Sequence, residues 1–142
     1  MTSSYFIDKY TLEERICEST KVKLSHPTHI CAIIEKSKNS TIKEIDKKKF
    51  LIPKTIKFID VIYIIRKKIN LSQSDAIYMF INDTIPSSNE NIETIYNKYK
   101  NQDGFLYIKY DTESTFGIGD ISPYDPLFQG PPVPFSYEVI NV

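Results

Sequence analysis

Few residues in this chain could carry catalysis or bind a metal ion. The two histidines, His26 and His29, lie three positions apart on either side of Pro27, and the two cysteines are Cys17 and Cys31. A zinc site or a general base would need a further ligand or partner at a fixed spacing, and the sequence does not offer one. Glycine-rich phosphate-binding motifs are absent as well. We therefore expect surface or strand-edge histidines, two half-buried free thiols, no metal site and no enzymatic activity.

One glycine lies where the composition of the chain changes sharply. It ends the stretch Ser114-Thr115-Phe116-Gly117; prolines are concentrated beyond it, and no Lys or Arg follows Lys109. Because glycine has no Cβ, both of its flanks can pass through a narrow enzyme cleft, and its carbonyl can be attacked without steric hindrance. A glycine after a strand is more often a simple linker, so these residues by themselves leave both interpretations open.

The charge of the chain is balanced overall but divided between its halves. The 142 residues carry 18 cations and 18 anions, yet residues 1–70 hold fifteen cations and eight anions, and residues 71–142 hold three and ten. Zero net charge argues against nucleic-acid binding through bulk charge, because phosphate binding needs a basic surface. A hydrophobic fraction of 41% suits a folded core. We expect no membrane span and no secretory signal, and hence a cytosolic or nuclear chain.

The apolar periodicity predicts the elements that must position these groups. Runs rich in β-branched and aromatic residues predict strands over 29–35, 48–53, 76–81 and 105–110. Helical spacing predicts a helix from Thr11 to the residue before Pro27 and another over 57–69, in which Phe58, Val61 and Ile65 share one stripe. A shorter helical turn is expected over 4–9. The order predicts an α+β fold of the β-grasp kind, with two additional N-terminal helices.

Capping signals mark the starts of two helices. Thr11 with Glu14 forms a capping box for the helix before Pro27, and Ser87 with Glu90 forms another ahead of a short helix. Gly104 is expected to help end that last helix with a positive φ. The face that we expect to be shared on the first helix is Leu12, Ile16, Ser19 and Lys23.

We divide the chain into three parts. Residues 1–27 form an N-terminal helical extension, residues 28–117 the β-grasp domain, and residues 118–142 a Pro/Gly-rich tail. The tail is poor in helix and strand signals and is expected to be extended. Within it, Leu127–Pro131 matches the cleavage sequence of the 3C-type proteases used in expression vectors, so an engineered origin for part of the tail stays open.

Several motifs, in one order, resemble the ubiquitin-like autophagy modifiers, the family of GABARAP and the microtubule-associated light chain. The resemblance covers about residues 5–117 and implies the β-grasp fold. The matching stretches are Glu44–Pro53, Val61–Ile69, Phe80–Pro86, Asp103–Tyr107 and Ser114–Gly117.

The resemblance implies a modifier that is itself processed. A cysteine protease would cut after Gly117, at the Gly117–Ile118 bond, so that residues 118–142 are a propeptide. Activating and conjugating enzymes would then carry Gly117, which follows Phe116, as a thioester to the amine of phosphatidylethanolamine. The chain would thus be cytoplasmic, and bound to the autophagosomal membrane once lipidated, with no other cofactor. The alternative is a β-grasp interaction scaffold that is never conjugated.

The resemblance also implies docking of short linear motifs from autophagy receptors and adaptors, with an aromatic residue three positions before Leu, Ile or Val. Such a peptide would add a strand to the edge at 49–52 and fill two pockets. Pocket one would comprise Val22, Cys31, Ile33, Lys49, Leu51 and Phe105. Pocket two would comprise Phe50, Ile52, Pro53, Ile56, Val61 and Ile64. The cations expected to attract acidic partner groups are Lys47, Lys48 and Arg66.

Two segments of the tail themselves fit this docking pattern. They are Tyr137-Glu138-Val139-Ile140 and Tyr124-Asp125-Pro126-Leu127. Matches to so loose a pattern arise often by chance. The sequence therefore leaves three interpretations open: docking onto the chain's own domain, docking onto a neighbouring copy, and no docking at all.

Overall fold

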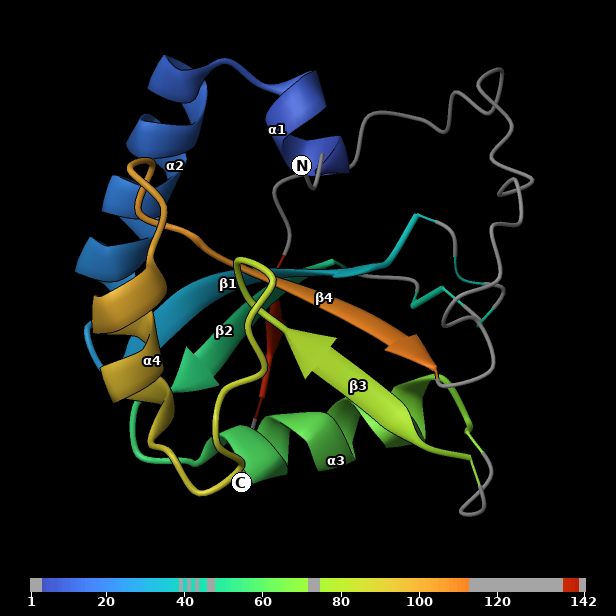
Figure 1. Ribbon diagram of the computed structural model, residues 1–142. Coiled ribbons are helices and arrows are strands. Elements are labelled where there is room, and N and C mark those ends of the chain that lie inside the picture. Colours follow the sequence, from blue (N-terminus) through green and yellow to red (C-terminus); the bar gives the residue numbers. More distant parts are fainter. Residues whose placement is uncertain are drawn as a thin grey trace.

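A mixed five-stranded sheet with the order β3-β4-β1-β2-β5 organises the protein (Figure 1). The computed structural model describes residues 4–38, 40, 42, 44–45, 48–71, 75–112 and 137–140. Strand β1 is parallel to β4 and antiparallel to β2, and β3 is antiparallel to β4. The elements are α1 (Tyr5–Lys9), α2 (Leu12–Ser25), β1 (His29–Lys36), β2 (Lys49–Pro53), α3 (Phe58–Lys68), β3 (Ile77–Phe80), α4 (Ile92–Tyr99), β4 (Leu106–Thr112) and β5 (Glu138–Val139).

The two faces of the sheet are covered by different helices. In Figure 1, α3 lies below the sheet, whereas α1 and α2 lie above it. Side chains alternate along a strand, so Ile30 and Ile34 of β1 join a cluster with α3, while Cys31 and Ile33 join a cluster with α1 and α2. We call these the α3-side cluster and the α2-side cluster. The predicted α+β architecture, with its two N-terminal helices, is confirmed.

Local signals explain much of this arrangement. The predicted capping box of α2 is present: Thr11 Oγ1 accepts from the Glu14 amide at 3.1 Å, and Glu14 Oε1 accepts from the Thr11 amide at 2.9 Å. The predicted stripe of α3 is also confirmed, because Phe58 and Val61 are fully buried in the α3-side cluster. Gly104 has the expected positive φ, of 91°.

The predicted start of α4 is wrong. Ser87 and Glu90 do not cap it; they close a separate turn, in which the Glu90 amide donates to the Ser87 carbonyl at 3.1 Å. The Glu90 carbonyl then accepts from the Phe58 amide at 2.9 Å, which ties this segment to the start of α3. The helix therefore begins afterwards, with Asn91 as its N-cap and the Glu93 amide donating to Asn91 Oδ1 at 2.8 Å.

The face predicted for α2 is only partly right, because Ser19 is buried but Ile16 and Lys23 are exposed. Its buried residues are Arg15, Ser19 and Val22, whereas Ile16 remains 41% exposed. The reason is polar: Arg15 Nη1 donates to Asp103 Oδ2 at 2.7 Å, and Ser19 Oγ donates to the Asp103 carbonyl at 2.6 Å. A buried ion pair, rather than an apolar stripe, therefore sets the rotation of α2.

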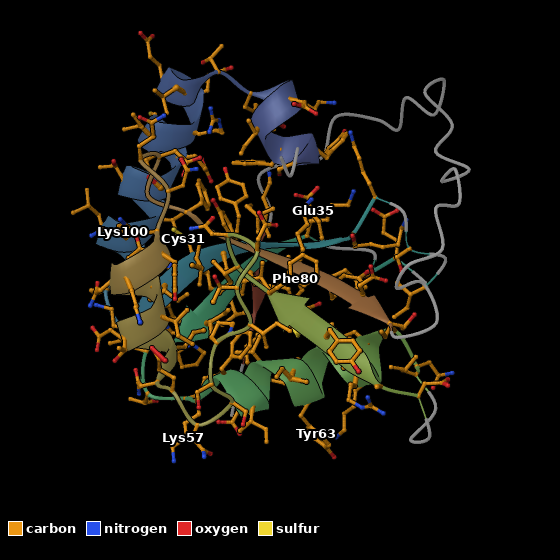
Figure 2. The ribbon with its side chains drawn as sticks, in the orientation of Figure 1. Cys31, Glu35, Lys57, Tyr63, Phe80 and Lys100 are labelled. Carbon is orange, nitrogen blue, oxygen red and sulfur yellow. The ribbon has the colours of Figure 1, made fainter. Side chains whose placement is uncertain are left out.

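A second buried carboxylate anchors α1. Glu35 of β1 is 5% exposed, accepts from the Tyr5 amide at 3.0 Å and also accepts the hydroxyl hydrogen bond of Ser4. Figure 2 shows Glu35 beneath α1. Lys109 of β4 lies 3.8 Å from the same carboxylate. The N-terminal extension is thus fixed to the sheet by charge and hydrogen bonds at two separate points.

The described end of the tail is extended, as predicted, and is paired with the sheet. Glu138 and Val139 form β5, which pairs in parallel with β2 through the partners Phe50–Glu138 and Leu51–Val139. Residues 113–136, which include most of the predicted tail, lie outside the described residues. None of the helices among the residues described is both long and apolar enough to cross a membrane.

The Arg15–Asp103 pair generates a test of how α2 is held. Arg15→Ala should lower the free energy of unfolding by about 3 kcal/mol, because it leaves the Asp103 carboxylate buried without its cation. Lys21→Ala, on the exposed face of α2, should change it by less than about 0.5 kcal/mol. Urea unfolding followed by circular dichroism measures both; equal values for the two variants would contradict the anchoring role.

Candidate functional site

The outer edge of β2 is where an extended peptide could join the sheet. One side of β2 pairs with β1, and its other side pairs with the short strand β5. Beyond the two paired positions, the Ile140 amide donates to the Leu51 carbonyl at 2.9 Å. An edge strand presents backbone N–H and C=O groups that accept a further strand in this way. The predicted docking edge at 49–52 therefore has a strand beside it.

The residues predicted for pocket one lie together on the α1 and α2 side of the sheet. The apolar members, Val22, Cys31, Ile33, Leu51 and Phe105, all belong to the α2-side cluster. Lys49 is only 2% exposed, and its Nζ lies 5.3 Å from the ring centroid of Phe6 and 5.6 Å from that of Tyr10. Tyr137 of the tail packs against this cluster. The structure thus brings the residues predicted for pocket one together, and Tyr137 packs against them.

Sequence reasoning missed three residues of this site. Phe6 and Tyr10 belong to or pack on the α2-side cluster, and their rings lie 5.1 Å apart. Glu18 of α2 accepts a hydrogen bond of 2.8 Å from the Tyr137 hydroxyl. Two aromatic residues four positions apart, one inside the predicted N-terminal turn and one directly after it, were a usable signal, whereas nothing in the local sequence marks Glu18.

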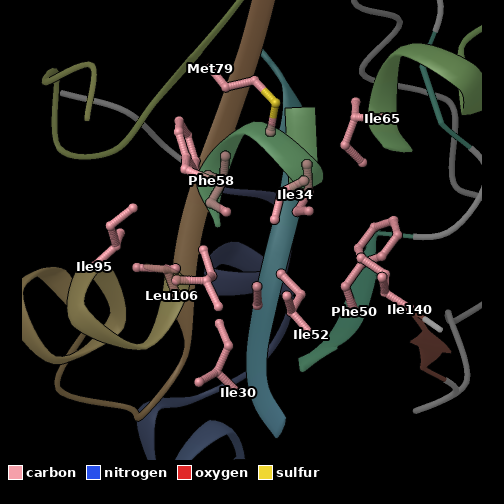
Figure 3. Close-up of a cluster of buried hydrophobic side chains, with 14 of the residues drawn as sticks. Ile30, Ile34, Phe50, Ile52, Phe58, Ile65, Met79, Ile95, Leu106 and Ile140 are labelled. Carbon is pink, nitrogen blue, oxygen red and sulfur yellow. The ribbon is translucent and has the colours of Figure 1, made fainter. Parts of the chain in front are cut away.

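The residues predicted for pocket two lie on the opposite face, beside α3. Phe50, Ile52, Ile56 and Val61 belong to the α3-side cluster, Ile64 packs against it, and Pro53 is partly buried at the end of β2. Ile140 of the tail is 4% exposed within the same cluster. Figure 3 shows Ile140 beside Phe50. Ile140 therefore packs among the residues predicted for pocket two.

The alternation of side chains along a strand explains why Tyr137 and Ile140, three positions apart, reach different clusters. Successive side chains of a strand point to opposite faces, so residues three positions apart also lie on opposite faces. Tyr137 accordingly reaches the α2-side cluster and Ile140 the α3-side cluster, on either side of β2. An aromatic-x-x-aliphatic segment is the pattern that such a site can hold.

Burial changes the acid–base properties of this site. It lowers the pKa of Lys49 to about 8, against a smaller opposing effect of Glu18. It raises the pKa of the Cys31 thiol to about 11, so this thiol stays protonated at neutral pH. Burial, followed by the hydrogen bond to Glu18, also raises the pKa of Tyr137.

The remaining predicted residues are dispersed. Lys48 Nζ lies 2.9 Å from the Glu44 carboxylate and 4.6 Å from the centroid of the Tyr5 ring, next to the start of β2. Arg66 of α3 donates to the Asp75 carbonyl at 2.8 Å. Lys47, Phe116 and Gly117 lie outside the described residues.

The histidines and cysteines form no constellation in the described part of the chain. The rings of His26 and His29 lie 6.0 Å apart, and His29 Nδ1 is hydrogen-bonded to Thr28. Both cysteines are free, as expected. The expected half-burial is wrong, because Cys17 is exposed and Cys31 is buried. Within the described ranges, no three His, Cys, Asp or Glu side chains could hold a metal ion.

Among the described residues, two open hollows lie outside the predicted pockets, the second of them near the end of β2. One, of about 290 Å³, is lined by residues that include Asn82, Lys100 and Lys109; the other, of about 270 Å³, includes Lys23 and Glu93. Neither contains a residue of the predicted pockets. At the predicted docking edge, Tyr137 and Ile140 pack against the residues of the two predicted pockets.

Comparison with known proteins identifies the family. Residues 14–117 match the family model described as "Autophagy protein Atg8 ubiquitin like". The chain belongs to the Atg8 family. It is 41% identical over 114 residues to autophagy-related protein 8 of Scheffersomyces stipitis, covering 80% of this chain and 82% of that protein. The family predicted from the sequence motifs is thereby confirmed, and the chain is a ubiquitin-like protein of autophagy.

Solved Atg8 structures have the same fold. The crystal structure of Trypanosoma brucei ATG8 matches with a TM-score of 0.77 and 38% identity, covering 81% of this chain and 99% of that one. Plasmodium falciparum Atg8, in complex with a peptide of Plasmodium falciparum Atg3, matches with a TM-score of 0.70 and 28% identity, covering 78% and 99%. The β-grasp assignment therefore agrees with experimental Atg8 structures.

The buried ammonium of Lys49 gives this Atg8-family chain a specific pH dependence. Since the folded-state pKa is about 8 and lies below that of the unfolded chain, the unfolded state binds more protons above pH 8, and stability should rise with pH. Between pH 7.5 and 9.5, the rise in unfolding free energy should exceed that of Lys49→Met by on the order of 1 kcal/mol.

Urea titrations at the two pH values measure this difference. Lys21→Met, which removes an exposed lysine of α2, should keep the wild-type rise. A Lys49→Met variant with the same rise as the wild type would show that the Lys49 ammonium does not lose water on folding.

Proposed function

We propose that this Atg8-family protein is cleaved after Gly117, conjugated to phosphatidylethanolamine, and docks aromatic-x-x-aliphatic motifs of autophagy receptors and adaptors. The observation that carries the conjugation part is the extent of the family match. It ends at residue 117, the glycine that follows Phe116, although the chain continues to residue 142. The conserved body of an Atg8 protein would thus end at the residue that carries the lipid.

In this proposal, other enzymes catalyse every step, and the chain contributes only the carbonyl of Gly117. A processing cysteine protease hydrolyses the Gly117–Ile118 bond, and the new Gly117 carboxylate passes as a thioester through the activating and conjugating enzymes. The amine of phosphatidylethanolamine then displaces the thiol and forms an amide. Glycine suits each transfer, because it has no Cβ to obstruct attack on its carbonyl. The Plasmodium falciparum Atg8 complex with an Atg3 peptide supports a conjugating-enzyme partner for this chain.

The docking part is supported by the geometry at β2. Two apolar clusters lie on opposite faces of one edge strand, at the spacing that an aromatic-x-x-aliphatic segment requires. Lys48 and Lys68 lie beside this edge and can attract acidic residues of a partner. The role of the protein is therefore to be attached and to bind, rather than to catalyse a reaction.

Processing would also change the charge of the protein. The tail carries three of the anions, Asp120, Asp125 and Glu138, and no cation. Its removal leaves a domain of formal charge +3 before the new carboxylate is counted. A basic protein suits a cytoplasmic form that becomes attached to the autophagosomal membrane, where it meets anionic headgroups and acidic motifs.

Cleavage at Gly117 is directly testable. Incubating the full chain with the processing protease of the family should remove residues 118–142, which intact-mass spectrometry detects. Addition of the conjugating enzymes, ATP and phosphatidylethanolamine vesicles should then give a form that floats with the vesicles. Gly117→Ala should prevent lipidation, because a side chain is placed at the reacting carbonyl.

Gly130→Ala is the matched control, since it changes a tail glycine and should be processed and lipidated like the wild type. An uncut wild-type chain would contradict the processing proposal and favour the alternative, a β-grasp scaffold that binds partners without being conjugated.

A further inference from the structure

The docking site of the full chain is already occupied by the chain itself. Tyr137 and Ile140 fill the two clusters, and β5 pairs with the outer edge of β2 between them. Two polar side chains of the segment also contact the domain. The Tyr137 hydroxyl donates to Glu18 at 2.8 Å, and the Glu138 carboxylate pairs with Lys68 of α3.

We propose that residues 137–140 are an intramolecular ligand that keeps the uncleaved protein closed to docking motifs. This inference rests on the proposed docking function, because the segment uses the site that a partner motif would use. It adds a regulatory role for the tail: the precursor is a form that cannot bind, and the processed protein is the form that can.

Three independent features favour specific docking over accidental contact. The backbone register places Glu138 opposite Phe50 and Val139 opposite Leu51, so the segment continues the sheet. The two anchoring side chains, Tyr137 and Ile140, pack against the protein, and Ile140 is only 4% exposed, whereas Val139 between them is 39% exposed. The one acidic side chain meets a lysine. Shape, polarity and charge of the segment thus all match the site.

Tethering makes such a ligand effective even when its own affinity is weak. Residues 113–136 link the segment to the end of β4, and a tether that can span to its site gives an effective concentration on the order of 1 mM. A segment with a dissociation constant of about 0.1 mM then weakens the apparent affinity of a competing peptide about tenfold. Modest contacts are therefore sufficient for closure.

The same hydrolysis that frees Gly117 would end the tethering. Water adds across the Gly117–Ile118 bond, which leaves a carboxylate on Gly117 and an amine on Ile118. Residues 118–142 then become a separate peptide, which dilution removes from the site. A single cleavage would prepare the chain for conjugation and open its docking site.

Competition on the full chain tests this proposal. The probe is a fluorescent synthetic peptide of residues 133–142, and fluorescence anisotropy measures its dissociation constant. Tyr137→Ala/Ile140→Ala should bind the probe at least about tenfold more tightly than the wild type. Tyr124→Ala/Leu127→Ala removes the same two kinds of side chain from the other motif-like segment of the tail and should bind like the wild type.

A second variant is needed because Ile140 is buried in the α3-side cluster, and its replacement could disturb folding. Glu138→Lys leaves both apolar anchors in place but sets two cations against each other at Lys68. It should raise the affinity for the probe severalfold. Sedimentation velocity at the same protein concentrations should show a monomer; a dimer would mean that the segment docks onto a neighbouring copy and would overturn the intramolecular proposal.

The outcomes separate this proposal from the docking function itself. Equal probe affinities for the wild type, Tyr137→Ala/Ile140→Ala and Glu138→Lys would show an open site in the precursor, and would overturn closure while leaving docking intact. Tighter binding by the Tyr124→Ala/Leu127→Ala control would also overturn the assignment to residues 137–140. No binding by any variant would overturn the docking function and closure together.

Discussion

Backbone groups at the outer edge of β2 need hydrogen-bond partners. The two apolar clusters lie on either side of this edge. Strand β1 is enclosed between β4 and β2, so β2 is the last strand of the ubiquitin-like core on its side of the sheet. Apolar side chains alternate across β2 and supply a separate cluster on each face. An added strand therefore gains backbone hydrogen bonds and two anchoring positions at once, which a flat surface could not provide.

The first of these positions exists only because the N-terminal helices are held against the sheet by two buried carboxylates. Asp103 binds α2 through Arg15 and Ser19, and Glu35 binds the start of α1. Gly104 contributes to the close approach of α2, because a Cβ there would lie 2.6 Å from Ser19 Oγ. Hydrogen bonds to the two carboxylates thus hold these helices in addition to the apolar contacts of Phe6 and Val22.

Sequence patterns predicted the parts of the structure that depend on local spacing. The stripe on α3 and the Thr11–Glu14 capping box follow from residues within two turns of one another, and the pocket residues follow from a family resemblance carried by several motifs. The rotation of α2 and the position of Tyr137 could not be predicted in the same way. They depend on Asp103 and Glu18, partners far away in the sequence, whose individual contributions leave no periodic signal. The prediction of where α4 starts was wrong for a related reason. The hydrogen bond between the Glu90 carbonyl and the Phe58 amide of α3 holds residues 87–90 in a separate turn.

The burial of Ile140 bears on how the protein behaves before it has any partner. An apolar groove at a strand edge is a site at which newly made chains adhere to one another. Here Ile140 of the same polypeptide covers the α3 side of that edge, so this apolar surface is not exposed to solvent once the full chain has folded. The tail thereby reduces the apolar surface through which folded copies of the chain could associate, and removal of residues 137–140 would expose that surface.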